Sequence, residues 1–260
     1  MKEDDLGAVK WIHGAPDCTR SDDPPLAVHR FDRDTFILRV SKCFSFEGNF
    51  LYLLCGRQRA ILFDTGGPAD PGSPFAVLPL RATVDAILAG WLEQRGQAEI
   101  ELVVAHTHGH GDHVFWDGQF ADRPRTRIVA PALDAVQQFF GLQEWPEGEA
   151  EFDLGGRILT IFPIPGHEPS HLAIYDPGTR ILLTGDLRAR PQMGEVGADL
   201  RRAGKLEKSA AKAGGVSPGS RYPGCGVRSR DRETFLGPCR QRVRWPANAS
   251  CPASPGIPSS

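Results

Sequence analysis

The sequence predicts an α/β fold in which strands and helices alternate along the chain. Three observations support this prediction. Short apolar runs rich in Val, Ile, Leu and Phe end at turn residues, as buried strands do. Two longer segments repeat their apolar residues at helical spacing. Finally, carboxylates and imidazoles directly follow several of the apolar runs, so the strand ends are expected to form a functional site.

The predicted elements cover residues 35–184. A hairpin turn at Gly56-Arg-Gln joins two early strands, and a Pro/Gly/Ser-rich loop at Pro68–Pro79 precedes the first helix. In that helix, Val84, Leu88 and Trp91 recur at the spacing of one helical face. In chain order the elements are strands Thr35–Val40, Asn49–Cys55 and Arg59–Asp64, helix Pro79–Arg95, strand Glu101–Ala105, helix Leu133–Leu142, and strands Arg157–Phe162, His171–Asp176 and Arg180–Thr184.

Residues 106–113 read His-Thr-His-Gly-His-Gly-Asp-His and predict a metal site. Within them, His108, His110, Asp112 and His113 form an H-x-H-x-D-H array of the ligand types that zinc prefers. Alternate positions of an extended segment project to one side, so His108, His110 and Asp112 are expected to converge. His113 would then point elsewhere, which suits two neighbouring ions.

Three further segments place a polar side chain at the end of an apolar run. Asp64 follows the run that ends at Phe63, His167 lies in a Pro-Gly-His turn, and Asp186 lies in a Thr-Gly-Asp turn. Glycine in such turns lets the backbone approach a site closely. Each turn alone is a weak indicator, and it is their order around the histidine array that makes them specific.

This ordered set resembles the metallo-β-lactamase fold superfamily, from about Phe31 to Asp186. The resemblance implies an αββα metallo-β-lactamase sandwich with the site along one edge of the two sheets and with the second half incomplete. The run from Pro165 to Asp176 is most similar to the hydrolases of the glyoxalase II-like and lactonase-like branch.

The resemblance also implies a role for each site residue. His108, His110 and His167 would hold the first metal, Asp112 and His113 the second, and Asp186 would bridge both. Asp64 would orient a ligand imidazole without touching a metal. Asp112 would be the catalytic residue, because it would position the attacking hydroxide and help to pass a proton. These seven assignments form the predicted site.

The implied activity is hydrolysis of a small-molecule thioester, lactone or ester with zinc as the cofactor, one or two ions being bound. The family supplies one more histidine to the second metal, whereas none of the eight histidines of this chain lies beyond His171. Two alternatives therefore stay open. One is a mononuclear iron enzyme of the persulfide dioxygenase type, and the other is an inactive truncated remnant that binds metal.

Other residues near the motif have structural explanations. We expect His106 to pack or to face away from the site, and Phe115 and Trp116 to pack beneath it. Thr107 is expected to tie the loop backbone with its hydroxyl. For His171 we favour a polar residue at the start of a strand, the alternative being a side chain beside a ligand or substrate.

Composition divides the chain into an N-terminal extension (1–30), the predicted domain (31–186) and a basic tail (187–260). The tail has 14 Lys and Arg against 5 Asp and Glu, whereas the residues before it have 16 against 27. Its many Pro, Gly and Ser residues predict disorder, except for a potential helix at Leu187–Ala213. We favour a tail of out-of-frame or spliced-in origin over an arm that binds nucleic acid.

The remaining features predict a cytoplasmic enzyme whose partner is a small-molecule substrate. The first residues contain no apolar leader segment, and no run of about 18 apolar residues predicts a membrane span. The six cysteines are widely spaced without a C-x-x-C pair, so we expect reduced thiols. No feature predicts an oligomeric state.

Overall fold

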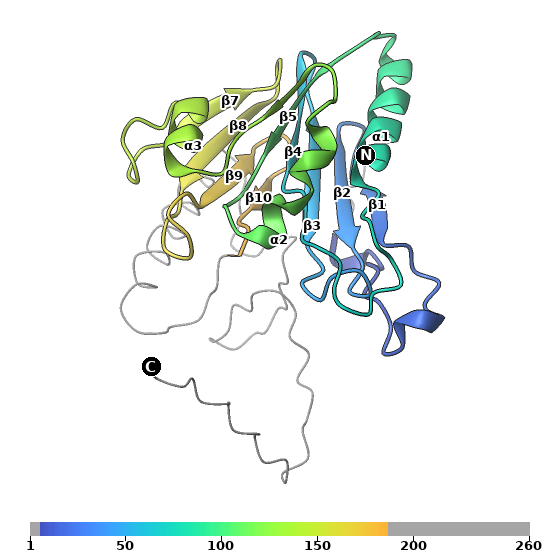
Figure 1. Cartoon of the computed structure of the whole chain (residues 1–260). Helices are drawn as coiled ribbons and strands as arrows, with labels where there is room; N and C mark the ends of the chain where they lie inside the picture. The colour runs from blue at the N-terminus through green and yellow to red at the C-terminus, as the bar shows by residue number, and fades with distance from the viewer. Residues whose placement is uncertain (1–5, 187–260) are drawn as a thin grey trace, which may run out of the picture.

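Two β-sheets stacked face to face form the centre of the molecule (Figure 1). The computed structural model describes residues 6–186. The predictions made for the tail (its disorder, its helix at 187–213 and its binding of nucleic acid) lie outside these residues. Within them the predicted α/β class with two packed sheets is confirmed.

The first sheet has six strands in the order β1-β2-β3-β4-β5-β6. Its first four strands are antiparallel neighbours, while β4, β5 and β6 run parallel. A parallel pair brings the carboxyl ends of its strands to the same edge, which positions the site described below. The strands are β1 (Leu26–Arg30), β2 (Thr35–Val40), β3 (Phe50–Cys55), β4 (Arg59–Phe63), β5 (Glu101–Ala105) and β6 (Thr126–Ile128).

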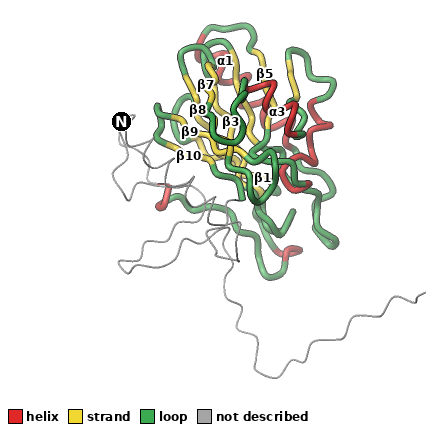
Figure 2. The backbone as a smooth tube through the Cα atoms, turned by 90° about the vertical axis from the view of Figure 1, so that its left-hand side faces the viewer, coloured by secondary structure: helices red, strands yellow, loops and turns green. Residues whose placement is uncertain are grey.

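In the described part of the chain, the second sheet has four antiparallel strands in the order β10-β9-β8-β7. Figure 2 shows β7 to β10 following one another in this order beside the first sheet. The strands are β7 (Ala150–Asp153), β8 (Ile158–Pro163), β9 (Leu172–Asp176) and β10 (Ile181–Leu183).

Within residues 6–186, three α-helices and three short 3-10 helices accompany the sheets. Helix α1 ends at Gly96, whose left-handed conformation lets its N–H cap the carbonyl of Glu93. No helix in the described part of the chain is long and apolar enough to cross a membrane. The helices are η1 (Leu6–Ala8), η2 (Cys18–Arg20), α1 (Leu80–Arg95), α2 (Gly111–Val114), η3 (Phe115–Phe120) and α3 (Leu133–Phe140).

The hydrophobic core has two main layers, one on each face of the first sheet. Between the sheets, Ile61 and Phe63 of β4 share a buried cluster with Ile161 of β8 and Ile174 of β9. On the opposite face, α1 packs Leu88 and its neighbouring apolar residues against the sheet. The outer face of the second sheet has only a small buried cluster around Ile164 among residues 6–186.

The predicted strands and helices are found within two residues of their expected ends. Three strands were not predicted, namely β1, β6 and β7. β6 and β7 are short, and all three lie at a sheet edge, where β1 and β7 bury one residue each and β6 buries none. β1 lies in the segment that we assigned to an N-terminal extension, yet it pairs with β2 along its whole length.

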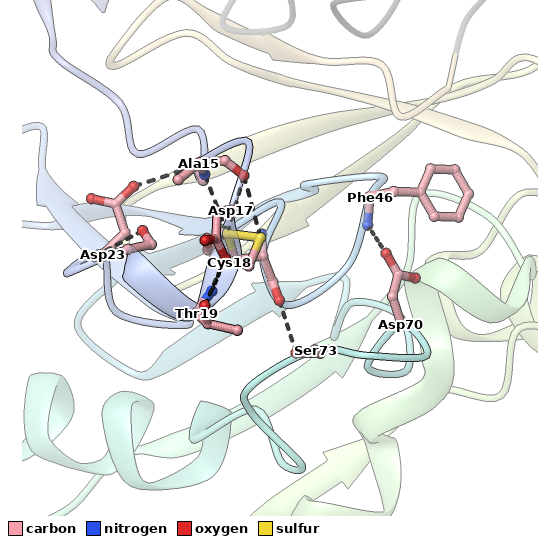
Figure 3. The surroundings of a disulfide bond; sticks show 12 residues. Ala15, Asp17, Cys18, Thr19, Asp23, Phe46, Asp70 and Ser73 are labelled. Carbon is pink, nitrogen blue, oxygen red and sulfur yellow. Dashed lines mark hydrogen bonds between the residues drawn. A yellow bond between two sulfur atoms is a disulfide. The ribbon is translucent and has the colours of Figure 1, made fainter.

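Our expectation of reduced cysteines was wrong for Cys18 and Cys43, which form a disulfide (Figure 3). The N-terminal segment crosses the loop between β2 and β3, so two cysteines far apart in sequence meet. The same loop is held by Ser73, whose hydroxyl donates to the Cys43 carbonyl at 2.8 Å. It is also held by Asp70, which accepts the Phe46 N–H at 2.6 Å (Figure 3). Cys55 is a buried free thiol.

Candidate metal centre

The predicted site residues lie at one end of the two sheets, where several strands finish. The histidine motif follows β5, and α2 within it lies at the lower end of the sheets in Figure 1. His167 lies in the connection between β8 and β9, and Asp186 lies in the turn after β10. Both sheets therefore contribute to the site.

The parallel pairing of β4 with β5 places Asp64 beside the histidine motif. Phe63 is opposite Ala105, and the Asp64 N–H donates to the Ala105 carbonyl at 2.9 Å. Asp64 then leaves the strand with φ of 66°, a left-handed conformation that few residues other than glycine adopt. This turn directs its carboxylate toward the motif.

The motif is not an extended segment, contrary to our expectation. It turns at His110, which directly precedes α2, and the His113 N–H donates to the His110 carbonyl at 2.9 Å. Because of this helical turn, the His113 ring returns to within 4.0 Å of the His108 ring, measured between centroids. The His113 ring is therefore adjacent to His108, although its donors group with Asp186 and not with His110 and His167.

The first candidate cluster consists of His108, His110 and His167. Each offers a ring nitrogen, and the three nitrogens lie within 4.8 Å of one another. The His108 and His110 nitrogens are 3.1 Å apart, and the His167 ring centroid is 4.5 Å from that of His110. Three converging imidazoles form a ligand set typical of zinc.

The second candidate cluster consists of His108, His113 and Asp186, again within 4.8 Å. His113 Nε2 is 3.5 Å from an Asp186 oxygen and 3.4 Å from an Asp112 oxygen. The two clusters share His108. A ring nitrogen has one lone pair and binds one ion, so His108 completes either cluster but not both through the same atom.

Asp64 contacts His113 and does not belong to either cluster. Its Oδ2 is 2.9 Å from His113 Nδ1, and its Oδ1 accepts the Thr107 N–H at 2.7 Å. The Thr107 hydroxyl also donates to Asp64 Oδ2 at 2.9 Å. We had expected this hydroxyl to bind the loop backbone, whereas it binds a carboxylate. A carboxylate on one ring nitrogen orients the other nitrogen toward an ion.

Three carboxylates surround His113 and create a negative potential. Burial lowers the pKa of His113, but Asp64 together with Asp112 and Asp186 raises it well above 6.5. Burial raises the pKa of Asp112, but the imidazole of His113, whose Nε2 is 3.4 Å away, outweighs burial and lowers the pKa to about 2. Burial also raises the pKa of Asp186, but His113 outweighs burial, so the pKa of Asp186 is lowered. A divalent cation benefits from the same potential and competes with the proton on His113.

The neighbouring imidazoles are held neutral instead. Burial, followed by the charges of His113 and His171, lowers the pKa of His108. Burial and the adjacent His167 lower the pKa of His171 to about 4. A neutral imidazole is the form that binds a metal.

The residues present fit a metal ion. His113 Nε2 is buried and makes no hydrogen bond with the described residues, although two carboxylates lie within 3.5 Å. A buried polar atom without a partner is costly, and a cation between His113, Asp112 and Asp186 would satisfy it. The nitrogen and oxygen donors are those that zinc prefers.

Of the other residues near the histidine motif, His106 and Trp116 lie as we expected and Phe115 does not. His106 is buried away from the clusters and contacts the Asp117 carboxylate at 2.9 Å. Trp116 is partly buried and donates to the Gly67 carbonyl at 2.8 Å, as expected of a packing residue. Phe115 is 52% exposed, so its expected packing beneath the site is wrong. The α2 turn carries it outward to the surface.

Sequence reasoning missed Asn49, whereas the position of His171 agrees with both interpretations considered for it. The Asn49 side chain hydrogen bonds to Asp112, although it comes from the start of the β3 region and belongs to no motif. His171 does precede a strand, β9, but its ring is fully buried and 4.8 Å from the His108 ring. Its spacing of four residues from His167 was the available indication.

Comparison with protein-family models matches residues 46–218 to the Metallo-beta-lactamase superfamily. The match extends past Asp186 into residues that the structure does not describe. A hydroxyacylglutathione hydrolase of Dechloromonas aromatica is 29% identical over 150 residues, covering 58% of this chain and 48% of that protein. One from Chromohalobacter salexigens is 30% identical over 146 residues, covering 55% and 48%. The chain thus spans about half the length of the curated relatives it matches.

Among solved structures, the metallo-β-lactamase from Hirschia baltica superposes with a TM-score of 0.47 at 16% sequence identity. The superposition covers 72% of this chain and 88% of that one.

Proposed function

Since the chain belongs to the metallo-β-lactamase superfamily, we propose that it is a zinc-dependent hydrolase of a small-molecule thioester. The observation that supports this most is the pair of donor clusters at one end of the sheets. Together they offer imidazole and carboxylate donors within 4.8 Å, which is close enough for one or two ions to be held beside a substrate.

The choice of a thioester is supported by the curated relatives. Both relatives described above are named hydroxyacylglutathione hydrolase. Because the chain spans only about half of their length, lactones and other esters remain part of the proposed substrate class. All three substrates need water to attack a carbonyl carbon.

The residues divide into those that hold the ion and those that act beside it. His108, His110 and His167 would hold the first ion. His113 and Asp186 would hold a second, with Asp112 beside it at 3.4 Å from His113. When bound, zinc supplies Lewis acidity, which lowers the pKa of a coordinated water from about 15.7 to about 7 and polarises a carbonyl. No nucleophilic side chain is then required.

Asp112 is the residue proposed to touch the reacting water. Its carboxylate is partly exposed, and its pKa of about 2 keeps it ionised at neutral pH. An ionised oxygen accepts a hydrogen bond from the attacking water and so orients its lone pair toward the carbonyl. Asn49 donates to the same carboxylate and limits its rotation.

The test combines metal content with turnover by the full chain. Purified protein is analysed for zinc and iron, and thiol release from a hydroxyacylglutathione thioester is followed in parallel with opening of a lactone. We expect zinc and thioester turnover, loss of turnover on chelation and its return with added zinc. His110→Ala is expected to lower turnover more than about 100-fold, because metal polarisation is worth several kcal/mol.

His13→Ala is the matched control, because His13 is exposed and lies outside both clusters. Equal activity of the His110→Ala and wild-type chains would contradict the proposal. Iron with oxygen consumption would favour the dioxygenase alternative. Bound zinc without turnover of either substrate would favour the inactive remnant.

A further inference from the structure

His171 lies against the metal centre without belonging to either donor cluster. Its side chain is fully buried, and its ring centroid is 4.8 Å from that of His108 and 5.7 Å from that of His167. Its Nε2 is 3.0 Å from the carbonyl oxygen of Thr184. A carbonyl only accepts, so Nε2 carries the proton and donates it.

The backbone around His171 joins the three segments that supply the site. The Leu172 N–H donates to the Thr107 carbonyl at 2.7 Å, which attaches β9 to the histidine motif. The His171 N–H donates to the Glu168 carbonyl at 3.2 Å, which closes the loop that carries His167. The side chain supplies the third link, to the turn that carries Asp186.

The Asp186 turn fits closely against His171. Gly185 has φ of 50°, and a Cβ added there would lie 2.9 Å from His171 Nε2 and 2.6 Å from Thr107 Oγ1. Both distances are shorter than van der Waals contact. The absence of a side chain at position 185 is therefore what allows the turn to approach the ring.

We propose that His171 is a positioning residue that holds the Thr184–Asp186 turn in place and so completes the His108, His113 and Asp186 cluster. The inference rests on the proposed metal centre but not on the identity of the substrate. Without this hydrogen bond, the turn loses the side-chain link that joins it to the residue directly before β9. Asp186 then moves away from His113, and the affinity of this cluster for zinc falls.

The experiment measures zinc bound per full-length chain after dialysis at a series of fixed free zinc concentrations. His171→Leu is expected to lower the zinc affinity of this cluster by about 10- to 100-fold, the usual effect of removing a residue that orients a ligand. His171→Gln keeps an N–H donor and is expected to restore most of the affinity. Gly185→Ala is expected to reproduce the loss with His171 intact.

A double-mutant comparison separates positioning from general stability. Asp186→Ala removes the ligand itself, so adding His171→Leu to it should cause no further loss of zinc. A residue that only stabilises the fold would lower zinc binding in both backgrounds. His29→Leu, which removes a ring on β1 in edge-to-face contact with Trp11, is the control and should leave zinc binding unchanged.

The outcomes distinguish the two proposals. A wild-type chain that binds no metal would overturn both the proposed function and the inference. Zinc binding that is equal in the wild-type and His171→Leu chains would overturn the inference alone. Additive losses in the double variant would do the same, since His171 would then act independently of Asp186.

Discussion

Asp64 combines an uncommon backbone conformation with three hydrogen-bond acceptor contacts at the centre of the site. Its φ of 66° costs free energy, of order 1–3 kcal/mol for a residue other than glycine. The contacts to Thr107 and His113 hold it there. Such strain is typical of positions where a side chain must point in one direction.

Replacing Asp64 tests its influence on His113. Asp64→Asn removes the charge beside His113 Nδ1 but keeps a side chain of the same size. We expect zinc affinity to fall by roughly 10- to 100-fold, because the imidazole loses its orienting carboxylate. Competition with a chromogenic chelator measures the affinity. Asp117→Asn, which alters the equivalent pair with His106, should change it less than about threefold.

At the residue scale, the sequence predicted which side chains lie together at the site but not the direction in which each one points. His108, His110 and His167 follow strand ends or turns, so their convergence could be expected. The direction of His113 depends on the helical turn that begins at His110, and four residues are too few to show a helical period. Asn49 could not be found, because its contact with Asp112 depends on how two loops meet.

At the scale of elements, Asp34 attaches the β1–β2 connection to α1. It accepts the Trp91 Nε1–H at 2.9 Å and pairs with Arg95. Burial raises the pKa of Asp34, but the hydrogen bonds from Trp91, Arg95 and Arg33 outweigh this and lower it below 3.8. The ionised carboxylate therefore stabilises the folded state above pH 3.8, and that contribution is lost as the pH falls through the lowered pKa.

The Asp34→Asn variant should show this dependence. We expect it to be less stable than the wild type at pH 7, and the difference should shrink as the pH falls below 3.8, where the wild-type carboxyl also becomes neutral. Urea unfolding at several pH values measures the difference. A stability gap that stays constant down to the lowest pH would contradict the assigned role.

Arg157 connects the two sheets. Its guanidinium donates to the Asp34 carbonyl at 2.7 Å and to the Thr35 hydroxyl at 2.8 Å, next to or within β2. It also donates to Asp176 Oδ2 at 2.5 Å, at the end of β9. The Asp176 side chain is only 4% exposed, and Arg157 is the counter-ion that it contacts.

Removing Arg157 is expected to be costly. Arg157→Ala leaves the Asp176 carboxylate buried without its counter-ion. We therefore expect the free energy of unfolding to fall by about 3–5 kcal/mol. Arg20→Ala removes an exposed pair with Asp17 and should cost less than about 1 kcal/mol. Denaturant unfolding of both variants checks the contrast; similar losses would show that burial does not set the cost.

The elements found from sequence were those with strong patterns. The buried strands β2 to β5 and the long helix α1 show nearly continuous apolar runs or a clear helical period. The strand β6 has three partly or fully exposed residues, and β7 buries only Phe152. Such edge strands depend on pairing with a neighbour, which local sequence does not report.

At the scale of the whole molecule, the disulfide adds a covalent restraint to the non-covalent core. Cys18 and Cys43 are 25 residues apart, and linking them restricts the unfolded chain. We expected a cytoplasmic location partly because we expected all cysteines to be reduced. The disulfide between Cys18 and Cys43 removes that part of the argument.

Cys18→Ser should lower the unfolding free energy by about 2–4 kcal/mol. Unfolding of the wild type with excess dithiol reductant should reach the same value, whereas reductant should leave the variant unchanged. Thiol titration of the unfolded chains before and after reduction counts the bond directly. An unfolding curve of the wild type that is insensitive to reductant would contradict this prediction.

The covalent ring from Cys18 to Cys43 encloses both β1 and β2. β1 is an edge strand, and an edge strand that detaches can pair with a second copy of the chain and produce an intertwined dimer. While the ring is closed, β1 stays within reach of its own β2 after any local opening. The bond therefore favours re-pairing within one molecule over strand exchange between molecules, and reduction removes that preference.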